Sequence, residues 1–343
     1  MKTLCVKVKK QDGESMRMQL INLGVLDRGL KVSSDADFLY LPVSASISDF
    51  MGGESFVTVV YDIEPVHKCI SVEDILGYSP KYEVIGSLAL IDVGGDGGSG
   101  DDGDNDDLIQ VDVQSVADAL LTTQKHVTTV IGAVSAVEGE FRIRRFIHLA
   151  GVPTTQTRCR ENGCDFLLDM ASVYFTPRLA TERARVVSQM GADDMVVDMF
   201  AGIGPYSIQA AKKVQRVIAI DKNPAACEFL AENVKLNRVG NVTIINADAR
   251  DVSGNYLQSA DWIIMNLPHL AHEFLDDAVA MTKPGGIIIY YDMRHEDDLF
   301  DTPVTLIKDT AKRIGRSVEV VGTRVVRSYA PHEYNIVVDA RIL

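Results

Sequence analysis

The sequence predicts an α/β protein, with a doubly wound parallel sheet in its C-terminal half, a mixed α+β middle domain and a small α+β domain at the N-terminus. From residue 191 onward, continuous apolar runs alternate with helical patterns, as is typical of parallel strands covered on both faces. The chain has 343 residues, 46% of them hydrophobic, whereas single cores rarely grow past about 250–300 residues. We therefore expect an N-terminal domain at 1–70, a linker at 71–110, a middle domain at 111–190 and a C-terminal domain at 191–343.

The N-terminal domain is predicted from two short apolar runs that flank a helical pattern. Residues 3–10 and 38–43 are expected to form strands, and apolar residues recur at helical spacing between positions 13 and 25. The middle domain begins with a second helical pattern. Its predicted elements are a helix at 113–124 and strands at 126–134, 144–151, 153–160 and 164–170.

A further helix is expected at residues 176–190. Thr176 has the side chain of an N-cap, and Pro177 is favoured at the first helical position. The apolar residues of this segment fall on one side, which leaves Glu182 near a polar edge.

The cysteines are predicted to be free thiols. They form no CxxC pair and no zinc spacing, and their odd number argues against a secreted disulfide framework. In a hairpin that turns at residues 162–163, Glu161 faces Cys164 and Phe166 faces Cys159, so these two sulfur atoms are not cross-strand partners. The five residues are Cys5, Cys69, Cys159, Cys164 and Cys227.

The net charge of −14 argues against a nucleic-acid partner, because Lys and Arg drive phosphate binding. However, residues 92–107 contain seven Asp and no basic residue, so the rest of the chain carries only −7. This segment has too few apolar residues to offset the entropy of ordering, and we expect a disordered loop. A calcium site is the alternative for "DGDNDD", although the Gly and distal Glu of an EF-hand loop are missing.

No targeting or membrane segment is predicted. The longest apolar stretches, such as 285–291, are far shorter than the roughly 18 residues of a membrane span. Residues 1–14 have no apolar signal core. The seven histidines show no metal-ligand spacing, so no protein metal site is predicted. We expect a soluble, cytoplasmic protein.

The C-terminal domain is predicted from a regular alternation of strands and helices. The expected strands are 195–200, 216–221, 242–248, 262–268 and 286–292, with one or two more within 326–342. The expected helices are 206–213, 224–237 and 272–282.

A glycine turn and three carboxylates indicate a nucleotide-like cofactor. Gly202 and Gly204 follow the first of these strands, where glycine permits a tight turn and close approach of a ligand. Asp198 ends that strand and suits the ammonium group of an amino-acid moiety, whereas it would repel a pyrophosphate. Asp221 ends the second strand and is expected to accept the ribose hydroxyls; Asp248 ends the third and is expected to meet an adenine amino group.

This ordered set favours S-adenosylmethionine over NAD or ATP. A NAD-binding or purely structural Rossmann fold is the alternative, but Ser207 stands where a dinucleotide fingerprint has its third Gly. The predicted cofactor-binding residues are Asp198, Phe200, Ala201, Gly202, Gly204, Asp221, Lys222, Asp248, Ala249 and Asn266.

The sequence "NLP" that ends the fourth strand points to the substrate. Asn266 can hydrogen-bond the edge of a base, and Pro268 fixes the loop that presents it. The motif resembles the Asn/Asp-Pro-Pro-aromatic signature of amino-methyltransferases, but Leu267 replaces the first Pro and His269 replaces the aromatic residue. A guanine N1 loses a proton on methylation while charge accumulates on O6, so the reaction calls for a general base and a donor to O6.

Glu182 is a candidate for that base and Arg142 for that donor. By pattern alone, the preferred explanations of these two residues are a surface Glu paired with a neighbouring Arg and a solvated basic strand. Arg142, Arg144 and Arg145 stand close together in "FRIRRF", where Arg142 and Arg144 are expected to share one face of a strand and offer a site for phosphates.

Six blocks, in this order, resemble the archaeal and eukaryotic tRNA (guanine-37-N1)-methyltransferases. They are "SVYFTPRLATERARV", "VVDMFAGIGPYSI", "AIDKNP", "MNLPHLAHEFLD", "GGIIIYYD" and "SYAPHEYNIVVD", and the opening of the chain is similar to the small N-terminal domain of that family. The acidic insertion at 92–107 departs from the family pattern without touching these blocks.

The resemblance implies a class I (Rossmann-like) methyltransferase domain, a middle domain, and an N-terminal module that contacts the tRNA elbow. It implies a monomer that binds tRNA, with magnesium assisting the reaction. It also implies that Glu182 accepts the proton, Arg142 steadies O6 and Asn266 positions the base. Tyr174 and Arg178 match positions near the flipped nucleotide.

The resulting hypothesis is a base flip followed by methylation of N1 of guanosine 37. Three alternatives remain open at this point. A related transferase moves the aminocarboxypropyl group of the same cofactor during wyosine synthesis, a methyltransferase of exocyclic amines would not need Glu182, and a catalytically dead tRNA-binding protein would not need intact Asp198, Asp221 and Asn266.

Overall fold

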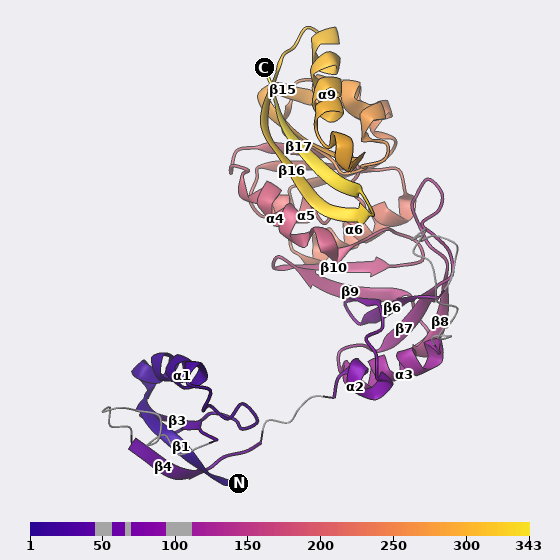
Figure 1. Cartoon of the computed structure of the whole chain (residues 1–343). Coiled ribbons are helices and arrows are strands. Elements are labelled where there is room, and N and C mark those ends of the chain that lie inside the picture. Colours follow the sequence, from indigo (N-terminus) through magenta and orange to yellow (C-terminus); the bar gives the residue numbers. More distant parts are fainter. Residues whose placement is uncertain (45–56, 66–69, 94–111) are drawn as a thin grey trace. The chain divides into compact units, whose positions relative to one another are not determined.

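The computed structural model describes residues 1–44, 57–65, 70–93 and 112–343. These residues form two compact units, Met1–Ser71 and Val72–Leu343 (Figure 1). Most of the predicted acidic loop at 92–107, with its alternative calcium site, lies outside the described residues, as does Cys69. The other four cysteines are free thiols, as the sequence predicted.

The N-terminal unit is a four-stranded antiparallel sheet with one helix. Its sheet has the order β2-β3-β1-β4, and Val6, Leu20 and Leu41 lie in its core. The elements are β1 (Lys2–Lys9), a 3-10 turn η1 (Lys10–Asp12), α1 (Gly13–Asn22), β2 (Ser33–Ser34), β3 (Phe38–Pro42) and β4 (Val57–Asp62). The two predicted strands and the helix between them are confirmed.

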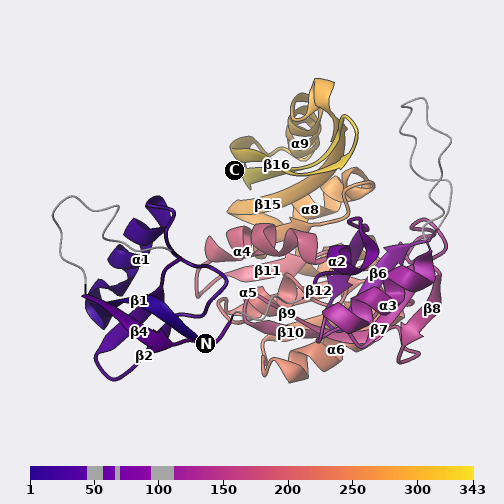
Figure 2. The same cartoon turned by 60° about the horizontal axis from the view of Figure 1, so that its bottom comes forward.

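The second unit begins with a four-stranded sheet of order β5-β6-β7-β8. The helices α2 and α3 lie side by side (Figure 2), and pack on one face of the sheet through Val72, Leu120 and Val130. The elements are α2 (Val72–Leu76), β5 (Tyr82–Ile85), β6 (Leu88–Asp92), α3 (Val113–Thr123), β7 (Thr129–Ala133) and β8 (Phe146–Gly151). The prediction of a linker throughout 71–110 is therefore wrong for 72–92, because these residues supply a helix and two strands.

The predicted hairpin follows as β9 (Gln156–Glu161) and β10 (Cys164–Asp169). Cys164 pairs with Glu161 and Phe166 with Cys159, so the register is the predicted one. Phe166 packs in one core with Ile131 of the four-stranded sheet and Ile264 of the C-terminal sheet. The middle and C-terminal regions thus share a core, which is why they form one compact unit where the sequence predicted two domains.

The C-terminal region is a seven-stranded sheet of order β13-β12-β11-β14-β15-β17-β16. β11 to β15 are parallel, whereas β17 runs antiparallel to both β15 and β16. The strands are β11 (Met195–Asp198), β12 (Arg216–Asp221), β13 (Val242–Asn246), β14 (Ala260–Met265), β15 (Thr282–His295), β16 (Val318–Ala330) and β17 (Glu333–Ile342).

Helices cover both faces of this sheet. Successive strand residues point to opposite sides, so each strand contacts the helices of both faces. Val196 packs with the helices of one face and Val197 with those of the other. One face carries α4 (Ala180–Ser188), α5 (Ser207–Ala211) and α6 (Pro224–Leu236); the other carries α7 (Ala249–Val252), α8 (Leu275–Met281) and α9 (Asp301–Arg313). The predicted doubly wound sheet is confirmed.

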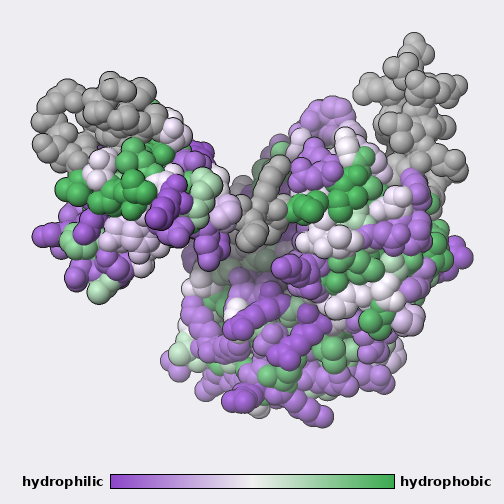
Figure 3. Space-filling view, turned by 90° about the horizontal axis from the view of Figure 1, so that it is seen from below, coloured by the Kyte–Doolittle hydropathy of each residue, from purple (hydrophilic) through white to green (hydrophobic). Residues whose placement is uncertain are grey.

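The surface of Val72–Leu343 is mainly hydrophilic on the face shown in Figure 3, with smaller apolar patches between polar side chains. Within the described ranges, no helix has the length and apolar character that a membrane span requires.

Candidate active site

The sheet order fixes where a ligand can bind. The chain runs outward from β11 through β12 to β13, and then returns to the other side of β11 as β14. Ligands of doubly wound sheets bind outside the carboxyl ends of the strands at this switch point. Residues 199–206 follow β11 and Asn266 follows β14, so both segments lie at that edge.

The glycine turn after β11 has the backbone that the sequence predicted. Gly202 and Gly204 have φ of +55° and +91°, in the left-handed region that favours glycine. A Cβ on Gly204 would lie 2.3 Å from Cδ1 of Leu230 in α6, so a side chain here would also have to displace Leu230. At Gly202 the space is open, and its N–H donates to Asp221 Oδ2 at 2.6 Å. The turn is therefore held against the end of β12.

Asp198 is buried beneath this turn. It is 1% exposed, and Ser207 Oγ donates to its Oδ2 at 2.7 Å. Its Oδ1 is buried without a hydrogen-bond partner among the described residues. Burial raises the pKa of this carboxyl to about 7. The sequence predicted a carboxylate directly beside the ligand, whereas here the group lies under the backbone that lines the cavity.

Asp221 and Asp248 are closer to the cavity and differ in their surroundings. Asp221 accepts hydrogen bonds from the backbone N–H groups of Gly202 and Asn223, and burial raises its pKa. Asp248 is the N-cap of α7. Arg250 donates to its two oxygens at 2.9 and 2.7 Å, and these hydrogen bonds lower the pKa of Asp248 to about 2. Asp248 is therefore an anion at neutral pH.

These groups surround one cavity of about 310 Å³. It extends from the ends of β12 and β13 past the segment after β14 to the strands β15, β16 and β17. Eleven of the predicted site residues line it: Arg142, Tyr174, Phe200, Ala201, Gly202, Asp221, Lys222, Asp248, Ala249, Asn266 and Pro268. The predicted residues that do not line it are Arg144, Arg145, Arg178, Glu182, Asp198 and Gly204.

Arg142 reaches the cavity from a turn. The predicted strand through "FRIRRF" is wrong, because residues 139–142 turn back and a bridge joins Glu138 to Ile143. Arg142 itself has φ of +55°, an uncommon conformation for a residue with a side chain. Its guanidinium carbon lies 5.5 Å from the ring centre of Tyr174, and its Nε is buried with no hydrogen-bond partner in the described ranges. The turn thus places a partly unpaired cation in the cavity wall.

The other predicted arginines lie apart from Arg142. Arg144 donates to Asp92 at 3.1 Å and to the carbonyl oxygen of Ser135. Arg145 lies 3.9 Å from Glu138. The three side chains therefore do not form the shared phosphate site that a strand would have created. Arg178 likewise makes an ion pair with Glu83, at 3.2 Å.

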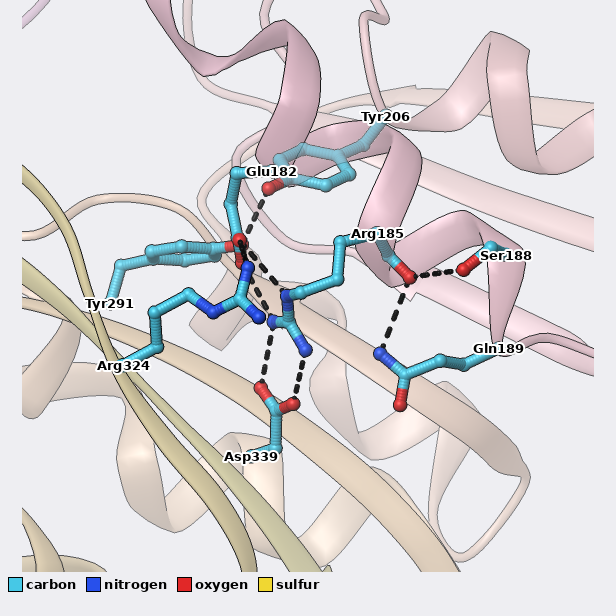
Figure 4. Close-up of polar contacts among 8 residues, drawn as sticks. All are labelled: Glu182, Arg185, Ser188, Gln189, Tyr206, Tyr291, Arg324 and Asp339. Carbon is cyan, nitrogen blue, oxygen red and sulfur yellow. Dashed lines mark hydrogen bonds and ion pairs between the residues drawn. The ribbon is translucent and has the colours of Figure 1, made fainter.

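Glu182 is 4% exposed, so the predicted position on a polar edge of its helix is wrong. Arg185 donates to its two oxygens at 2.7 and 2.9 Å, and Tyr291 donates to Oε1 at 2.9 Å. On its other side, Arg185 bonds to Asp339 at 2.5 and 3.1 Å (Figure 4). Burial opposes the charge of Arg185, but these carboxylates raise its pKa above the ordinary value. Tyr206 extends the cluster through its hydroxyl, 2.5 Å from that of Tyr291.

The sequence analysis gave no role to the wall formed by the last three strands. Met293 of β15, Arg327 and Tyr329 of β16 and Asn335 of β17 all line the cavity. The block "SYAPHEYNIVVD" contains two of them, but only the fold shows that they face Asn266 across the sheet edge. Arg183 was missed as well: it lines the cavity and is 2% exposed, with two hydrogen bonds of 2.6 Å to Glu161.

Two family models match this chain. One describes the TRM5/TYW2 methyltransferase domain and matches residues 157–321; the other describes the tRNA methyltransferase 5 N-terminal domain and matches residues 5–51. The tRNA (guanine(37)-N(1))-methyltransferase Trm5b of Pyrococcus abyssi is 38% identical over 349 residues, which cover 99% of each chain. The chain belongs to the Trm5 family.

Solved structures of the Trm5 family have the same fold. A complex of aTrm5 and tRNALeu is similar to this chain with a TM-score of 0.69 and 32% sequence identity, covering 99% of this chain and all of that one. The C-terminal region is therefore a class I, Rossmann-like methyltransferase domain.

A second activity occurs among Trm5 relatives. A tRNA(Phe) (4-demethylwyosine(37)-C(7)) aminocarboxypropyltransferase of Methanocaldococcus jannaschii is 38% identical over 207 residues, covering 60% of this chain and 82% of the relative.

Proposed function

We propose that this protein transfers the methyl group of S-adenosylmethionine to N1 of guanosine 37 in tRNA. One observation carries the proposal: a single cavity at the switch point brings Asp221 and Asp248 together with Asn266 and Arg142. The carboxylates suit an adenosine moiety, and the amide and guanidinium suit a purine. Full-length similarity to Trm5b supports the same reaction.

The cofactor end of the cavity fits the donor. Asp221 already accepts two backbone N–H groups, and its oxygens retain lone pairs for ribose hydroxyls. The open space at Gly202 lets a ligand approach the backbone, and the unpaired Oδ1 of Asp198 lies behind the same turn. When bound, S-adenosylmethionine supplies an electrophilic methyl group.

The residues opposite the donor are proposed to hold the flipped guanine. Extruding a base exposes the edge that a duplex or stacked loop hides. Asn266 is half-buried at the end of β14 and can bond that edge. Arg142 offers N–H groups to O6, where negative charge grows as N1 loses its proton. The unpaired Nε of Arg142 supports this assignment.

Glu182 is proposed as the base that takes the N1 proton. Its carboxylate is held by Arg185 and Tyr291 and does not line the cavity. The role therefore requires the Glu182 side chain to leave Arg185 and turn toward the cavity when tRNA binds. Methyl transfer to an exocyclic amine would need no such movement. The general base therefore distinguishes methylation of N1 from methylation of an exocyclic amine.

Transfer of the aminocarboxypropyl group is the second candidate, because a relative with that activity is 38% identical to part of this chain. That similarity covers 60% of the chain, whereas similarity to Trm5b covers 99%. The greater coverage favours methylation. The intact cavity, which Asp221 and Asn266 both line, argues against a protein that binds tRNA without reacting.

The decisive experiment is mass spectrometry of nucleosides from a G37 tRNA incubated with the protein and S-adenosylmethionine. We expect 1-methylguanosine. An aminocarboxypropyl adduct, N2-methylguanosine or an unmodified nucleoside would each contradict the proposal, and each has a distinct mass or chromatographic position.

The role of Glu182 is tested by single-turnover kinetics of Glu182→Ala. We expect a rate lower by about 10²–10⁴-fold with cofactor binding retained, since a positioned base contributes about that much. Glu228→Ala, at an exposed position of α6, is the control and keeps the wild-type rate. A wild-type rate for Glu182→Ala would remove Glu182 from the mechanism.

The remaining predictions concern partners and conditions. We propose that a monomer binds tRNA in the cytoplasm, with the N-terminal unit contacting the elbow, and that Arg144, Arg145 and Arg178 bind phosphates after exchanging their present carboxylate partners. We also propose that magnesium assists the reaction without a dedicated protein site.

A further inference from the structure

The guanidinium of Arg185 is shared between two carboxylates (Figure 4). Its Nε and Nη2 donate to Glu182 at 2.9 and 2.7 Å, and its Nη1 and Nη2 donate to Asp339 at 2.5 and 3.1 Å. The side chains of Glu182 and Asp339 are 5% and 9% exposed, and that of Arg185 is 20% exposed. Arg185 therefore keeps a bidentate partner if either carboxylate leaves.

The two carboxylates stand on elements of different kinds. Asp339 lies within β17, which is hydrogen-bonded to β15 on one side and to β16 on the other. Glu182 lies in the first turn of α4, and its side chain has one more rotatable bond than that of Asp339. Glu182 is therefore the carboxylate that can leave Arg185, and Asp339 is the one that stays.

Glu182 lies close to the cavity without lining it. It accepts a hydrogen bond from Tyr291 at 2.9 Å, and Tyr291 is two residues before Met293, which lines the cavity. Residues two apart in a strand share one face and are roughly 7 Å apart. The next residue of α4, Arg183, also lines the cavity. The movement that the proposed reaction requires of Glu182 is therefore a movement of its side chain.

The charge that is left behind decides how readily Glu182 can move. If Arg185 had no other partner, the departure of Glu182 would leave a largely buried guanidinium without a counter-charge, which is strongly unfavourable. With Asp339 in place, the departure leaves a neutral bidentate pair, which is the strongest arrangement of a guanidinium and a carboxylate. Arg324 lies 3.8 Å from Glu182 and is 53% exposed, so its charge stays in contact with water.

We propose that Asp339 is a positioning residue for the methyl transfer: it retains Arg185 when Glu182 turns to the cavity, and so sets how often the general base is free. Asp339 does not line the cavity, so it acts through Arg185. The N1 proton still goes to Glu182, and no proton moves at Asp339. The inference rests on the proposed role of Glu182 and adds the residue that makes its release favourable.

The test compares single-turnover rates at saturating tRNA and S-adenosylmethionine for wild type, Asp339→Asn, Arg185→Gln and the double variant. Asp339→Asn removes the charge that retains Arg185. We expect its rate to fall about 10–100-fold, since two charge-assisted hydrogen bonds become neutral ones. Arg185→Gln removes the bidentate hold on Glu182, and its rate should be at least that of the wild type. The double variant should recover the rate lost in Asp339→Asn, because Arg185 is no longer there to be retained.

A cluster that only supports the fold would give a different order of rates. Arg185→Gln would then be as slow as Asp339→Asn or slower, because it removes the cation from both carboxylates, and the double variant would be no faster than either. Each of these results contradicts the inference. A loss of affinity for tRNA or S-adenosylhomocysteine that explains the lower rate of Asp339→Asn contradicts it too.

Two measures keep the comparison sound. All rates are taken at 25 °C, where circular dichroism shows whether each variant is folded, and recovery in the double variant remains decisive if Arg185→Gln does not fold. Asp276→Asn is the matched control, because it breaks an exposed pair with Arg313, at 2.8 Å, far along the chain from Glu182. It should keep the wild-type rate.

Failure of the proposed function would be seen separately. Mass spectrometry of the wild-type product decides the reaction. A crystal structure with G37 tRNA and S-adenosylhomocysteine decides the inference whatever that product is. We expect Glu182 at the cavity and Arg185 still within about 3 Å of Asp339. Glu182 still bonded to Arg185, or Arg185 drawn away from Asp339, would overturn the inference even if 1-methylguanosine forms.

Discussion

Substituting Arg185 by Gln tests whether the cluster around Glu182 is held together by charge. Arg185 lies between Glu182 and Asp339, whose side chains are 5% and 9% exposed. Its removal takes the bidentate partner from two buried carboxylates and leaves Glu182 only the more distant Arg324, at 3.8 Å. Breaking a buried pair in this way costs about 3–5 kcal/mol. One kcal/mol lowers the midpoint of thermal unfolding by about 2 °C in a unit of this size, so Tm should fall by roughly 6–10 °C.

The assay is thermal unfolding followed by circular dichroism. Adding Glu182→Gln to Arg185→Gln removes one of the two buried negative charges and should recover part of the lost Tm. Arg341→Gln is a matched control, since Arg341 pairs with Glu319 at 2.7 Å but both side chains are well exposed. It should cost no more than about 1 kcal/mol. Equal losses in the two variants would refute the reasoning.

Three further predictions concern the buried carboxyl under the glycine turn, a buried ion pair and the turn itself. Burial raises the pKa of Asp198 to about 7, against 3.8 in the unfolded chain. The stability that this group contributes is therefore fully present below about pH 4 and is lost as pH rises toward 7. Asp198→Asn should flatten that part of the curve of unfolding free energy against pH. Glu161→Gln leaves buried Arg183 unpaired and should cost about 3–5 kcal/mol in urea unfolding. Gly204→Ala places a Cβ against Leu230 at positive φ and should cost about 1–3 kcal/mol and weaken binding of S-adenosylhomocysteine in calorimetry.

Matched variants separate these effects from general damage. Asp193→Asn, at an exposed carboxylate just before β11, should leave the pH dependence of stability unchanged. Glu83→Gln breaks the more exposed pair with Arg178 and should cost no more than about 1 kcal/mol. Gly254→Ala meets open space at an ordinary φ and should be nearly neutral. If any control behaves like its partner, the corresponding explanation is wrong.

Much of the fold was predictable because its signals are local. The alternation of strands and helices after residue 191, the hairpin at residues 162–163 and the N-cap at Thr176 each depend on neighbouring residues, and all three are confirmed. The boundary between the middle and C-terminal regions was not predictable, because Phe166 and Ile264 share a core that only folding brings together.

The residues of the site were also predictable only in part. Asp221 and Asn266 were predictable as cavity residues, since each stands at the end of a parallel strand and such ends meet at one edge. Arg142 reached the cavity for a reason that the pattern did not contain, a turn where a strand was expected. Helical spacing placed Glu182 on a polar edge, because it records only which residues share a face of the helix. It does not record that Glu182 is buried, with hydrogen bonds from the half-buried Arg185 and the buried Tyr291.

The sequence by itself determined the doubly wound sheet, the glycine turn, the order of the carboxylates and the resemblance that identified the family. These features are encoded in residues close together along the chain, or in blocks whose order is fixed. Tertiary structure alone decided that Glu182 is buried with an Arg185 that also pairs with Asp339. It also decided that Asn335 and Arg327 line the cavity with polar atoms that have no hydrogen-bond partner among the described residues. Those relations join residues up to 154 positions apart, from Arg185 to Asp339, and depend on burial and direction, which a linear pattern does not record.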